Sequence, residues 1–511
     1  MLDESDRRRA AAHGVDEAEL ERQVRLLRGP ARSVRVLRPC TPGDGLATLG
    51  PEEHGPLLEA HGGAAAAGRC RKFVPASGAA TRMFADLMAC LHGGTEPGSA
   101  GADPPAEVRV LRTFLDRLEE FPFRDLLRER IPAPGGSPAP LGAVRPARRV
   151  LEALLLPEGL GFAALPKGLL PFHRYPSELR TPLEEHLVEA AALVRDADGT
   201  ARLHLTVSME HEALFRARLE AVTPELEGRL GTRFEVTFST QDPSTDTVAL
   251  EPGGELFHTA AGDLLFRVSG HGALLQNLGS LDGDLVLIKN VDNVAPDPRK
   301  PPAFLWSRLL LGLLARLQDE VHAACRGLES DPRDEATLET AASLARRLHR
   351  REAPRPGESR AGHLLRLLDR PVRVCGMVPN EGEPGGGPFW VEGPEGDSLQ
   401  IVEGAQIDPG SDSQARIFAS GTHFNPVFLA CALRDHHGRP FRLERFVDPE
   451  AVIIARKTHE GRDLLALERP GLWNGAMAHW NTVFVEVPGS VFTPVKTVLD
   501  LLRPEHRVDA A

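Results

Sequence analysis

Apolar and polar residues follow two alternating periods through the middle of the chain. Between about residues 150 and 300, segments with helical spacing (180–194, 210–222) alternate with short apolar runs (203–208, 233–239, 283–293). Helices that alternate with strands are typical of an α/β fold. The pattern therefore predicts a mixed, mostly parallel sheet with helices on both faces. In such a sheet, ligands bind beyond the carboxyl ends of the strands.

Helical periodicity dominates three further parts of the chain. Residues 1–65 are expected to form a helical lead-in, because VDEAELERQVRLL combines helical spacing with an acidic first turn. Residues 301–370 are also strongly helical. Segments rich in Gly, Pro and Ala (93–105, 132–146) flank an amphipathic helix, AEVRVLRTFLDRLEEF. We therefore expect helical insertions at about 93–150 and at 301–370.

Strand-like stretches return in the last third of the chain, at PVRVCGMV, PFWVEG and NTVFVEVPG. A helix is expected at the end, over VKTVLDLLRP (495–504). We therefore divide the folded core between residues 66–300 and residues 371–511.

Composition narrows the class of protein. A chain of 511 residues with 41% apolar and 26% charged residues is globular and long enough for two or three packed units. Its net charge of -12 gives no general attraction to nucleic acid or anionic membranes, so a polyanionic ligand needs a local site. The six scattered cysteines, the lack of a long apolar run and the charged N-terminus lead us to expect a cytoplasmic protein.

Lysine is scarce in this chain, which holds 60 lysines and arginines together. The bias fits a GC-rich genome. Where arginine is the default cation, a lysine indicates a position that the wide guanidinium does not suit. The lysines are Lys72, Lys167, Lys289, Lys300, Lys457 and Lys496.

A loop of small residues follows the apolar run KFVPA and precedes a helical pattern. Small side chains let a backbone approach a phosphate closely, and amides at the start of a helix bind anions. Arg82, at the end of this loop, is placed to reach a leaving pyrophosphate. An ordinary strand-to-helix turn is the alternative reading. The loop residues are Ser77, Gly78, Ala79, Ala80, Thr81 and Arg82.

Two further charged residues occupy constrained positions. Lys167 stands between Pro166 and Gly168, where a rigid loop can aim its compact charge at a phosphate, although a solvated loop lysine is the alternative. Asp292 follows the apolar run LVLIKN. A carboxylate at a strand end is a typical magnesium ligand, and it is also a common helix cap.

Two glycine-rich segments, 270–274 and 382–388, are candidates for close backbone approach to a ligand or for ordinary surface turns. His271 within the first is expected to be a hydrogen-bonding loop residue rather than a catalytic base. The histidines show no zinc-binding spacing, and the sequence has no P-loop and no G-x-S-x-G elbow.

Taken in order, these segments resemble the motifs of UDP-sugar pyrophosphorylases, above all the eukaryotic-type UDP-N-acetylhexosamine pyrophosphorylases. SGAATRM corresponds to that family's G-G-x-G-T-R loop, and the chain also has the P-K-G, G-x-G-[GA]-L, V-D-N and F-[ST]-P-[LV]-K motifs. The last of these contains Lys496. The whole chain is also similar to an uncharacterised bacterial family that shares the strings PASGAATRM and KGLLPFH.

The resemblance implies a Rossmann-like fold of the GT-A type and a nucleotidyltransferase that joins a sugar 1-phosphate to a nucleoside triphosphate, UTP in the family, with Mg²⁺ on Asp292. It assigns catalysis to Arg82, Lys167 and Lys496. It places the loop 77–81, Gln241, Gly270, His271 and Gly272 against the nucleotide. It places Glu383 and Asn425 in a sugar-binding half within 371–511.

The chain departs from the family in two ways. Where the family has a glycine-rich loop, this chain has Ser77, Gly78, Ala79 and Ala80, and alanine in place of glycine restricts positive φ. The stretch between Arg82 and Pro166 is longer than in the family, so either the pocket differs or the insertion forms a lid. A GT-A type glycosyltransferase and a non-catalytic nucleotide-sugar-binding homologue therefore remain alternatives.

Overall fold

The computed structural model describes residues 3–30, 32–94, 104–131, 146–350, 352–382, 385–394 and 396–508. The chain forms two compact units. The first unit comprises Met1–Phe73, Ser239–Ile288 and Ser307–Gly489, and the second comprises Val74–Phe238, Lys289–Trp306 and Ser490–Ala511. Both units therefore contain segments that are far apart in the sequence.

A mostly parallel sheet runs through the first unit, as the alternating pattern predicted. The pairs β12–β19, β19–β3, β2–β3 and β11–β4 are parallel, and β12–β16 is antiparallel. The α/β fold with a mostly parallel sheet is thus confirmed. Its order is β2 (Thr41–Pro42), β3 (Gly45–Ala47), β19 (Asn481–Glu486), β12 (Val372–Pro379), β16 (Phe428–Ala432), β11 (Leu285–Lys289) and β4 (Cys70–Pro75), and β15 (His423–Phe424) pairs with β12.

Two smaller sheets complete the strands of the first unit. One contains β1 (Val36–Pro39), β13 (Gly387–Val391) and β14 (Ser398–Val402). The other contains β10 (Phe266–Arg267), β9 (Thr247–Leu250), β18 (Arg462–Glu468) and β17 (Ile453–His459). The short helices α10 (Leu274–Gly279) and α14 (Asp412–Ala419) belong to the same unit.

The lead-in contains more than the helices expected of it. Its described residues form the helices α1 (Glu4–His13), α2 (Glu17–Arg28) and α3 (Pro51–Ala66). Leu20 and Val24 of α2 pack in one hydrophobic cluster with Val248 of β9. Between α2 and α3, however, the chain forms β1, β2 and β3. These strands are only two to four residues long, too short for the period of a strand to show in the sequence.

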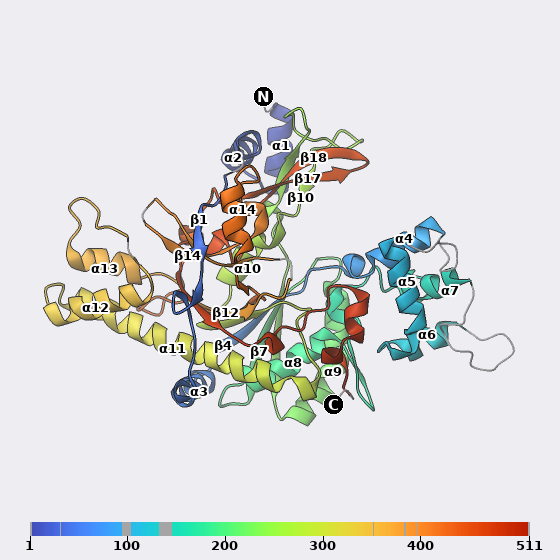
Figure 1. The fold of residues 1–511 in the computed structure, drawn as a ribbon, viewed down its shortest axis with the longest axis horizontal. Helices are drawn as coiled ribbons and strands as arrows, with labels where there is room; N and C mark the ends of the chain where they lie inside the picture. The colour runs from blue at the N-terminus through green and yellow to red at the C-terminus, as the bar shows by residue number, and fades with distance from the viewer. Residues whose placement is uncertain are drawn as a thin grey trace. The chain divides into compact units, whose positions relative to one another are not determined.

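The helical segment after residue 300 is present as predicted. It consists of α11 (Pro301–Ser330), α12 (Glu335–Arg347) and α13 (Arg360–Leu368). In the first unit, α12 and α13 lie beside the C-terminal part of α11 (Figure 1). Arg347 of α12 forms a 2.7 Å ion pair with Glu320 of α11.

Strands and helices also alternate in the second unit. Ala76, just after β4, donates its N–H to the carbonyl of Thr206 at 2.8 Å, so β7 (Thr200–Thr206) runs beside the end of β4. Strand β8 (Arg233–Ser239) follows β7 in the sheet. Helices α8 (Pro182–Leu193) and α9 (Glu212–Leu230) supply Leu187 and Phe215 to the hydrophobic cluster that also contains Leu205 of β7. A two-stranded ribbon, β5 (His173–Arg174) with β6 (Leu179–Arg180), precedes α8.

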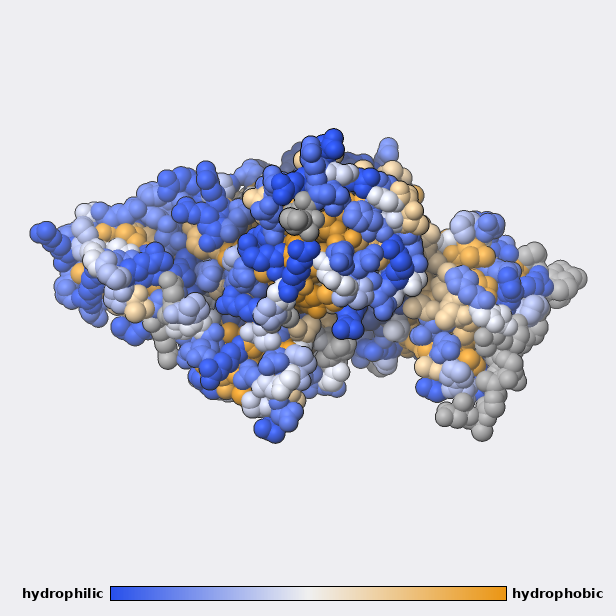
Figure 2. All heavy atoms as spheres, turned by 90° about the horizontal axis from the view of Figure 1, so that it is seen from above, coloured by the Kyte–Doolittle hydropathy of each residue, from blue (hydrophilic) through white to orange (hydrophobic). Residues whose placement is uncertain are grey.

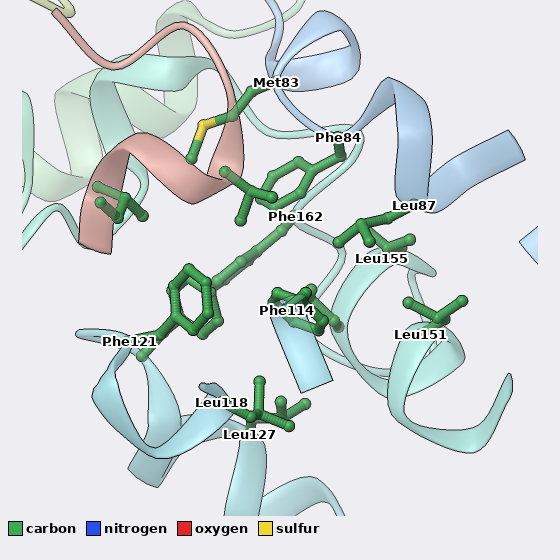
Figure 3. Packing of buried hydrophobic residues seen from close by; sticks show 14 of the residues in the cluster. Met83, Phe84, Leu87, Phe114, Leu118, Phe121, Leu127, Leu151, Leu155 and Phe162 are labelled. Atoms are coloured by element: carbon green, nitrogen blue, oxygen red, sulfur yellow. The ribbon is translucent and has the colours of Figure 1, made fainter. Parts of the chain in front are cut away.

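Among the described residues of the insertion expected at about 93–150, two complete helices are present, α5 (Ala106–Asp116) and α6 (Arg124–Arg130). They are grouped in Figure 1 with α4 (Ala85–Gly93), which precedes that range, and with α7 (Ala147–Leu155), which extends beyond it. Phe114 and Leu151 are among the side chains that converge in the core of this group (Figure 3). The linker residues 95–103 and 132–145 lie outside the described residues.

The prediction of a helix over residues 495–504 is wrong. The segment instead forms two short 3₁₀ turns, Val498–Leu502 and Pro504–His506. The carboxylate of Asp500 accepts hydrogen bonds from the main-chain N–H groups of Lys496 and Thr497, at 2.8 and 2.7 Å. These side-chain bonds compete with helical ones, and Pro504 disfavours a helical conformation at the residue before it.

Hydrophilic residues predominate on the face of the molecule shown in Figure 2. Among the described residues, the large hydrophobic side chains that are exposed are those of Met209, Leu214 and Val268. Within the part of the chain that the structure describes, no helix has both the length and the apolar character needed to cross a membrane.

Candidate anion-binding site

A buried carboxylate in the second unit binds two lysines through one oxygen. Oδ2 of Asp292 accepts hydrogen bonds from Nζ of Lys167 at 3.0 Å and from Nζ of Lys496 at 2.9 Å. The side chain of Asp292 is 9% exposed, that of Lys167 12% and that of Lys496 57%. Three predicted site residues from distant parts of the chain therefore meet, and one lysine of the group opens to solvent.

The charges of this cluster act on one another. Burial by itself raises the pKa of Asp292, but Lys167 and Lys496 hold that pKa below its usual value. Burial lowers the pKa of Lys167; Asp292 opposes this shift, whereas the charges of Lys496 and Arg82 add to it. One buried anion thus stands among three cations, so the site attracts anions.

The loop 77–82 and the loop around Lys167 are joined directly. The N–H of Ala80 donates to the carbonyl of Leu165 at 3.0 Å, and the N–H of Lys167 donates to the carbonyl of Gly78 at 3.1 Å. Arg82 ends the 3₁₀ turn Ala80–Arg82 and is exposed. The first two candidate segments therefore lie side by side.

The backbone of loop 77–82 does not depend on glycine. Ala79 has φ of -68° and ψ of 154°, and no residue of the loop has positive φ. The alanines at 79 and 80 therefore cause no backbone strain, in contrast to the restriction expected from the sequence. The amides of Ser77, Gly78 and Ala79 form no hydrogen bond with any described residue, so they are available to an anion.

Main-chain hydrogen bonds hold the segment that contains Lys496 against the residues that follow β11. The N–H of Val495 donates to the carbonyl of Asp292 at 3.1 Å, and the carbonyl of Val495 accepts a 2.8 Å bond from Nζ of Lys167. Neither this carbonyl nor the carboxylate of Asp500 was predicted from the sequence. The spacing of Thr497 and Asp500 (T-x-x-D) is that of a capping box, so it was a signal for the role of Asp500.

Apolar neighbours fix the charged residues in place. Ala80, Met83, Val294, Val495 and Val498 all belong to the hydrophobic cluster at the core of the helical insertion. Met83 is seen beside the C-terminal segment in Figure 3. Because these residues flank Arg82, Asp292 and Lys496 in the sequence, packing of the cluster determines where the three charges lie.

Gly168 is required by close packing, and replacing it with alanine is expected to destabilise the protein. A Cβ at this position would lie 2.8 Å from Cζ of Phe215 and 3.0 Å from Cγ2 of Val291. Overpacking of a core costs about 1–3 kcal/mol. We expect Gly168→Ala to lower the thermal unfolding temperature.

Gly78→Ala is the matched control for this substitution. A Cβ at Gly78 would have no heavy atom within 4 Å, and its φ is not positive. Its thermal unfolding should match that of the unmodified protein. If Gly168→Ala were equally stable, the packing around Lys167 would be looser than the structure indicates.

The second unit also contains a network of buried polar side chains. His173, the last residue of the string KGLLPFH, is bonded through Nδ1 to Oε1 of Glu185 at 2.8 Å and through Nε2 to Nδ1 of His506 at 3.0 Å. Lys300 binds Glu185 and, at 2.8 Å, Asp297. Burial alone would raise the pKa of Glu185, but Lys300 and His173 lower it to about 2. No pattern in the sequence predicts this network, which links His506 to helix α8 through His173 and Glu185.

The remaining predicted site residues belong to the first unit. Gln241 lies two residues beyond the end of β8 and is half-buried. His271 accepts a 2.9 Å hydrogen bond at Nδ1 from the N–H of Leu472 and stacks on Trp473, with ring centroids 4.0 Å apart. His271 lies in the 3₁₀ turn Gly270–Ala273, and its ring makes a hydrogen bond of the kind expected from the sequence. A Cβ at Gly272 would lie 2.3 Å from the carbonyl oxygen of Pro470, so backbone packing requires this glycine.

Asn425 is 4% exposed, and its side chain supports an unusual backbone. Its Oδ1 accepts a 3.1 Å bond from the N–H of Val427, whose φ is 56°. A positive φ is strained for a β-branched residue. Glu383 lies outside the described residues. The substrate contacts assigned to Gln241, Gly270, His271, Gly272, Glu383 and Asn425 stay predictions.

The fold is similar to that of known pyrophosphorylases. UDP-glucose pyrophosphorylase from Leishmania major is 14% identical, with a TM-score of 0.47 over 98% of this chain and 78% of that chain. Uridine diphosphate N-acetylglucosamine pyrophosphorylase from Trypanosoma brucei is 12% identical, with a TM-score of 0.49 over 98% of this chain and 79% of that chain. The sequence matches no curated protein. Residues 3–507 match the model of one family over nearly the whole chain, and the protein therefore belongs to the family described as domain of unknown function DUF4301.

Proposed function

We propose that this protein is a nucleotidyltransferase that condenses a sugar 1-phosphate with a nucleoside triphosphate and releases pyrophosphate. The observation that supports the proposal is the meeting of Lys167 and Lys496 on the buried Asp292, next to the small-residue loop that ends in Arg82. The order of the motifs along the chain supports a UDP-sugar product, and hence UTP as the triphosphate.

The proposed reaction is an in-line displacement at the α-phosphorus. An oxygen of the sugar phosphate attacks this phosphorus, the bond to the bridging oxygen of the β-phosphate breaks, and pyrophosphate leaves with the bonding electrons. The attacking group is already an anion, so the protein needs no general base. Its task is to position the reactants and to neutralise charge.

Each cation has a distinct place in this proposal. Nζ of Lys167 has three protons and uses two of them on Asp292 and on the carbonyl of Val495. The third is available to an oxygen of the α-phosphate. Arg82 and the amides of residues 77–79 would hold the leaving phosphates. Lys496, which is 57% exposed, would meet the incoming sugar phosphate.

Asp292 fits the role of a magnesium ligand. Mg²⁺ is commonly held by one or two carboxylates together with substrate phosphates. Oδ2 of Asp292 is occupied by the two lysines, whereas Oδ1 accepts no hydrogen bond from any described residue. A magnesium ion that arrives with the triphosphate would bind there and neutralise phosphate charge.

Replacing Asp292 with Asn is expected to raise the concentration of Mg²⁺ needed for half-maximal activity, because an amide oxygen carries no formal charge. The measurement is pyrophosphate release against Mg²⁺ concentration at saturating substrates. Asp263→Asn is the control, since the side chain of Asp263 is 70% exposed in the other unit. An unchanged magnesium dependence in Asp292→Asn would exclude Asp292 as the ligand.

The function itself is tested by offering the four nucleoside triphosphates with a panel of sugar 1-phosphates and Mg²⁺. We expect pyrophosphate release with at least one pair. A protein that binds a nucleotide but exchanges no labelled pyrophosphate into triphosphate would be a non-catalytic homologue. Consumption of a nucleotide sugar without pyrophosphate chemistry would identify a glycosyltransferase instead.

A further inference from the structure

Two histidines and two carboxylates gather at one place in the first unit, apart from the residues assigned above. His436 and His437 lie in the loop after β16. Glu329 lies in the last turn of α11, and Asp369 directly follows α13. Three elements that are distant in the sequence thus bring potential metal ligands together.

The distances between these groups suit a metal ion. Nε2 of His436 lies 3.0 Å from Oε1 of Glu329, and Nε2 of His437 lies 3.3 Å from Oε2 of the same carboxylate. One ligand atom from each of these three residues can be chosen so that all lie within 4.8 Å of one another. In a tetrahedral zinc site with bonds of about 2.0–2.1 Å, ligand atoms are roughly 3.3 Å apart. The residues therefore need little movement to share an ion.

His436 provides independent support, because one of its ring nitrogens lacks a partner. The residue is 7% exposed, and its buried Nε2 forms no hydrogen bond with any described residue. Although Glu329 is only 3.0 Å away, the two atoms do not meet in hydrogen-bond geometry. Buried polar atoms without partners are rare, and a bound metal ion is one recognised explanation for them.

Asp369 determines which nitrogen of His436 is free for a metal. Nδ1 of His436 lies 3.3 Å from Oδ1 of Asp369, at hydrogen-bond distance. A proton on Nδ1 leaves a lone pair on Nε2, directed to the side of Glu329. This lone pair and the carboxylate of Glu329 repel each other unless a cation lies between them. A carboxylate on the outer nitrogen of a ligating histidine is the usual second-shell arrangement of metal sites.

The loop that carries the histidines is held rigidly. The carboxylate of Asp435 accepts 2.9 Å hydrogen bonds from the N–H groups of His437 and Arg439. From α11, Nε2 of His322 lies 3.1 Å from the carbonyl oxygen of Arg434. The helix that supplies Glu329 therefore also positions the loop, and the cluster is largely formed before any ion binds.

We propose that His436, His437 and Glu329 bind a divalent ion of the zinc class, with Asp369 as the positioning residue on His436. Imidazole nitrogen together with carboxylate suits zinc, whereas Mg²⁺ prefers oxygen ligands. The side chains of Glu329 and His437 are 42% and 43% exposed, so a fourth coordination position is open to water or to a ligand. Glu329, Asp369 and His436 also line a cavity of about 1330 Å³.

The test is a titration of the untagged, chelator-treated full chain with Co²⁺, which has a visible absorption band in a tetrahedral site. We expect one equivalent to bind and Zn²⁺ to displace it. His437→Ala and Glu329→Gln should weaken binding at least 100-fold. Asp369→Asn should weaken it about 10–100-fold, as is usual for a second-shell partner.

Two control variants make the result decisive. His459→Ala removes another partly exposed histidine of the first unit, one that stands 3.9 Å from Glu460, and should leave Co²⁺ binding unchanged. Asp292→Asn should also leave it unchanged, which separates this site from the proposed magnesium site. No stoichiometric binding, or binding that His437→Ala does not weaken in a variant with normal thermal unfolding, would overturn the proposal.

Discussion

Lys167→Met is expected to lower kcat/KM for pyrophosphate release by about 10²–10³, the usual effect of losing one group that stabilises charge in a transition state. The ammonium of Lys167 is the least exposed cation of the site and the one fixed from two sides, by Asp292 and by the carbonyl of Val495. Methionine keeps an unbranched apolar stem of similar length and removes the charge. Asp292 retains its bond to Lys496, so the fold should persist.

Lys457→Met is the matched control for this substitution. The side chain of Lys457 is 45% exposed and stands 3.7 Å from Glu468 in the first unit. Its kcat/KM should equal that of the unmodified protein. Thermal unfolding of both variants shows whether folding is affected. Near-normal turnover in Lys167→Met would remove Lys167 from the proposed mechanism.

Lys300→Met is expected to lower the free energy of unfolding by up to about 3–5 kcal/mol, because it removes the nearest cation from the buried carboxylate of Glu185 and leaves the more distant guanidinium of Arg180, 3.6 Å away. The side chain of Lys300 is 2% exposed and that of Glu185 is fully buried. Of the neighbouring charges that lower the pKa of Glu185 against the effect of burial, Lys300 has the largest effect. Urea unfolding followed by circular dichroism measures the loss.

A double-mutant cycle identifies the cause of this loss. Glu185→Gln removes the charge whose nearest cation is lost in Lys300→Met, so the double variant should lose less stability than the sum of the two single losses. Additive losses would show that the two side chains contribute independently. Lys457→Met again serves as the control for the loss of an exposed lysine, and we expect it to change stability little.

The scarcity of lysine is a sequence signal that applies to functional and to structural lysines alike. It drew attention to Lys167, which meets Lys496 on Asp292. It applies equally to Lys289 and Lys300, which are buried in ion pairs with Glu189 and Glu185. A compact ammonium suits any closed site with few acceptors, whether that site binds a ligand or holds helices together. The scarcity of lysine therefore predicts that a lysine lies in a closed site, but it does not distinguish a ligand-binding lysine from a structural one.

The sequence by itself determined the elements that depend on local pattern. The alternation of helical and apolar segments predicted the α/β fold and the mostly parallel sheet, and the order of the short motifs predicted which loops carry Arg82, Lys167, Asp292 and Lys496. Both follow from the spacing of residues close together in the chain. Strands of two to four residues and the 3₁₀ turns near the C-terminus were missed because they have no period of their own.

Only the tertiary structure decided which of these residues meet. Residues 167, 292 and 496 share one carboxylate oxygen because apolar residues beside them pack into a common core. In the same way, Glu329 joins His436 and His437 because α11 supports the loop that follows β16. Contacts across more than a hundred residues depend on how whole elements pack, and no local pattern encodes that packing.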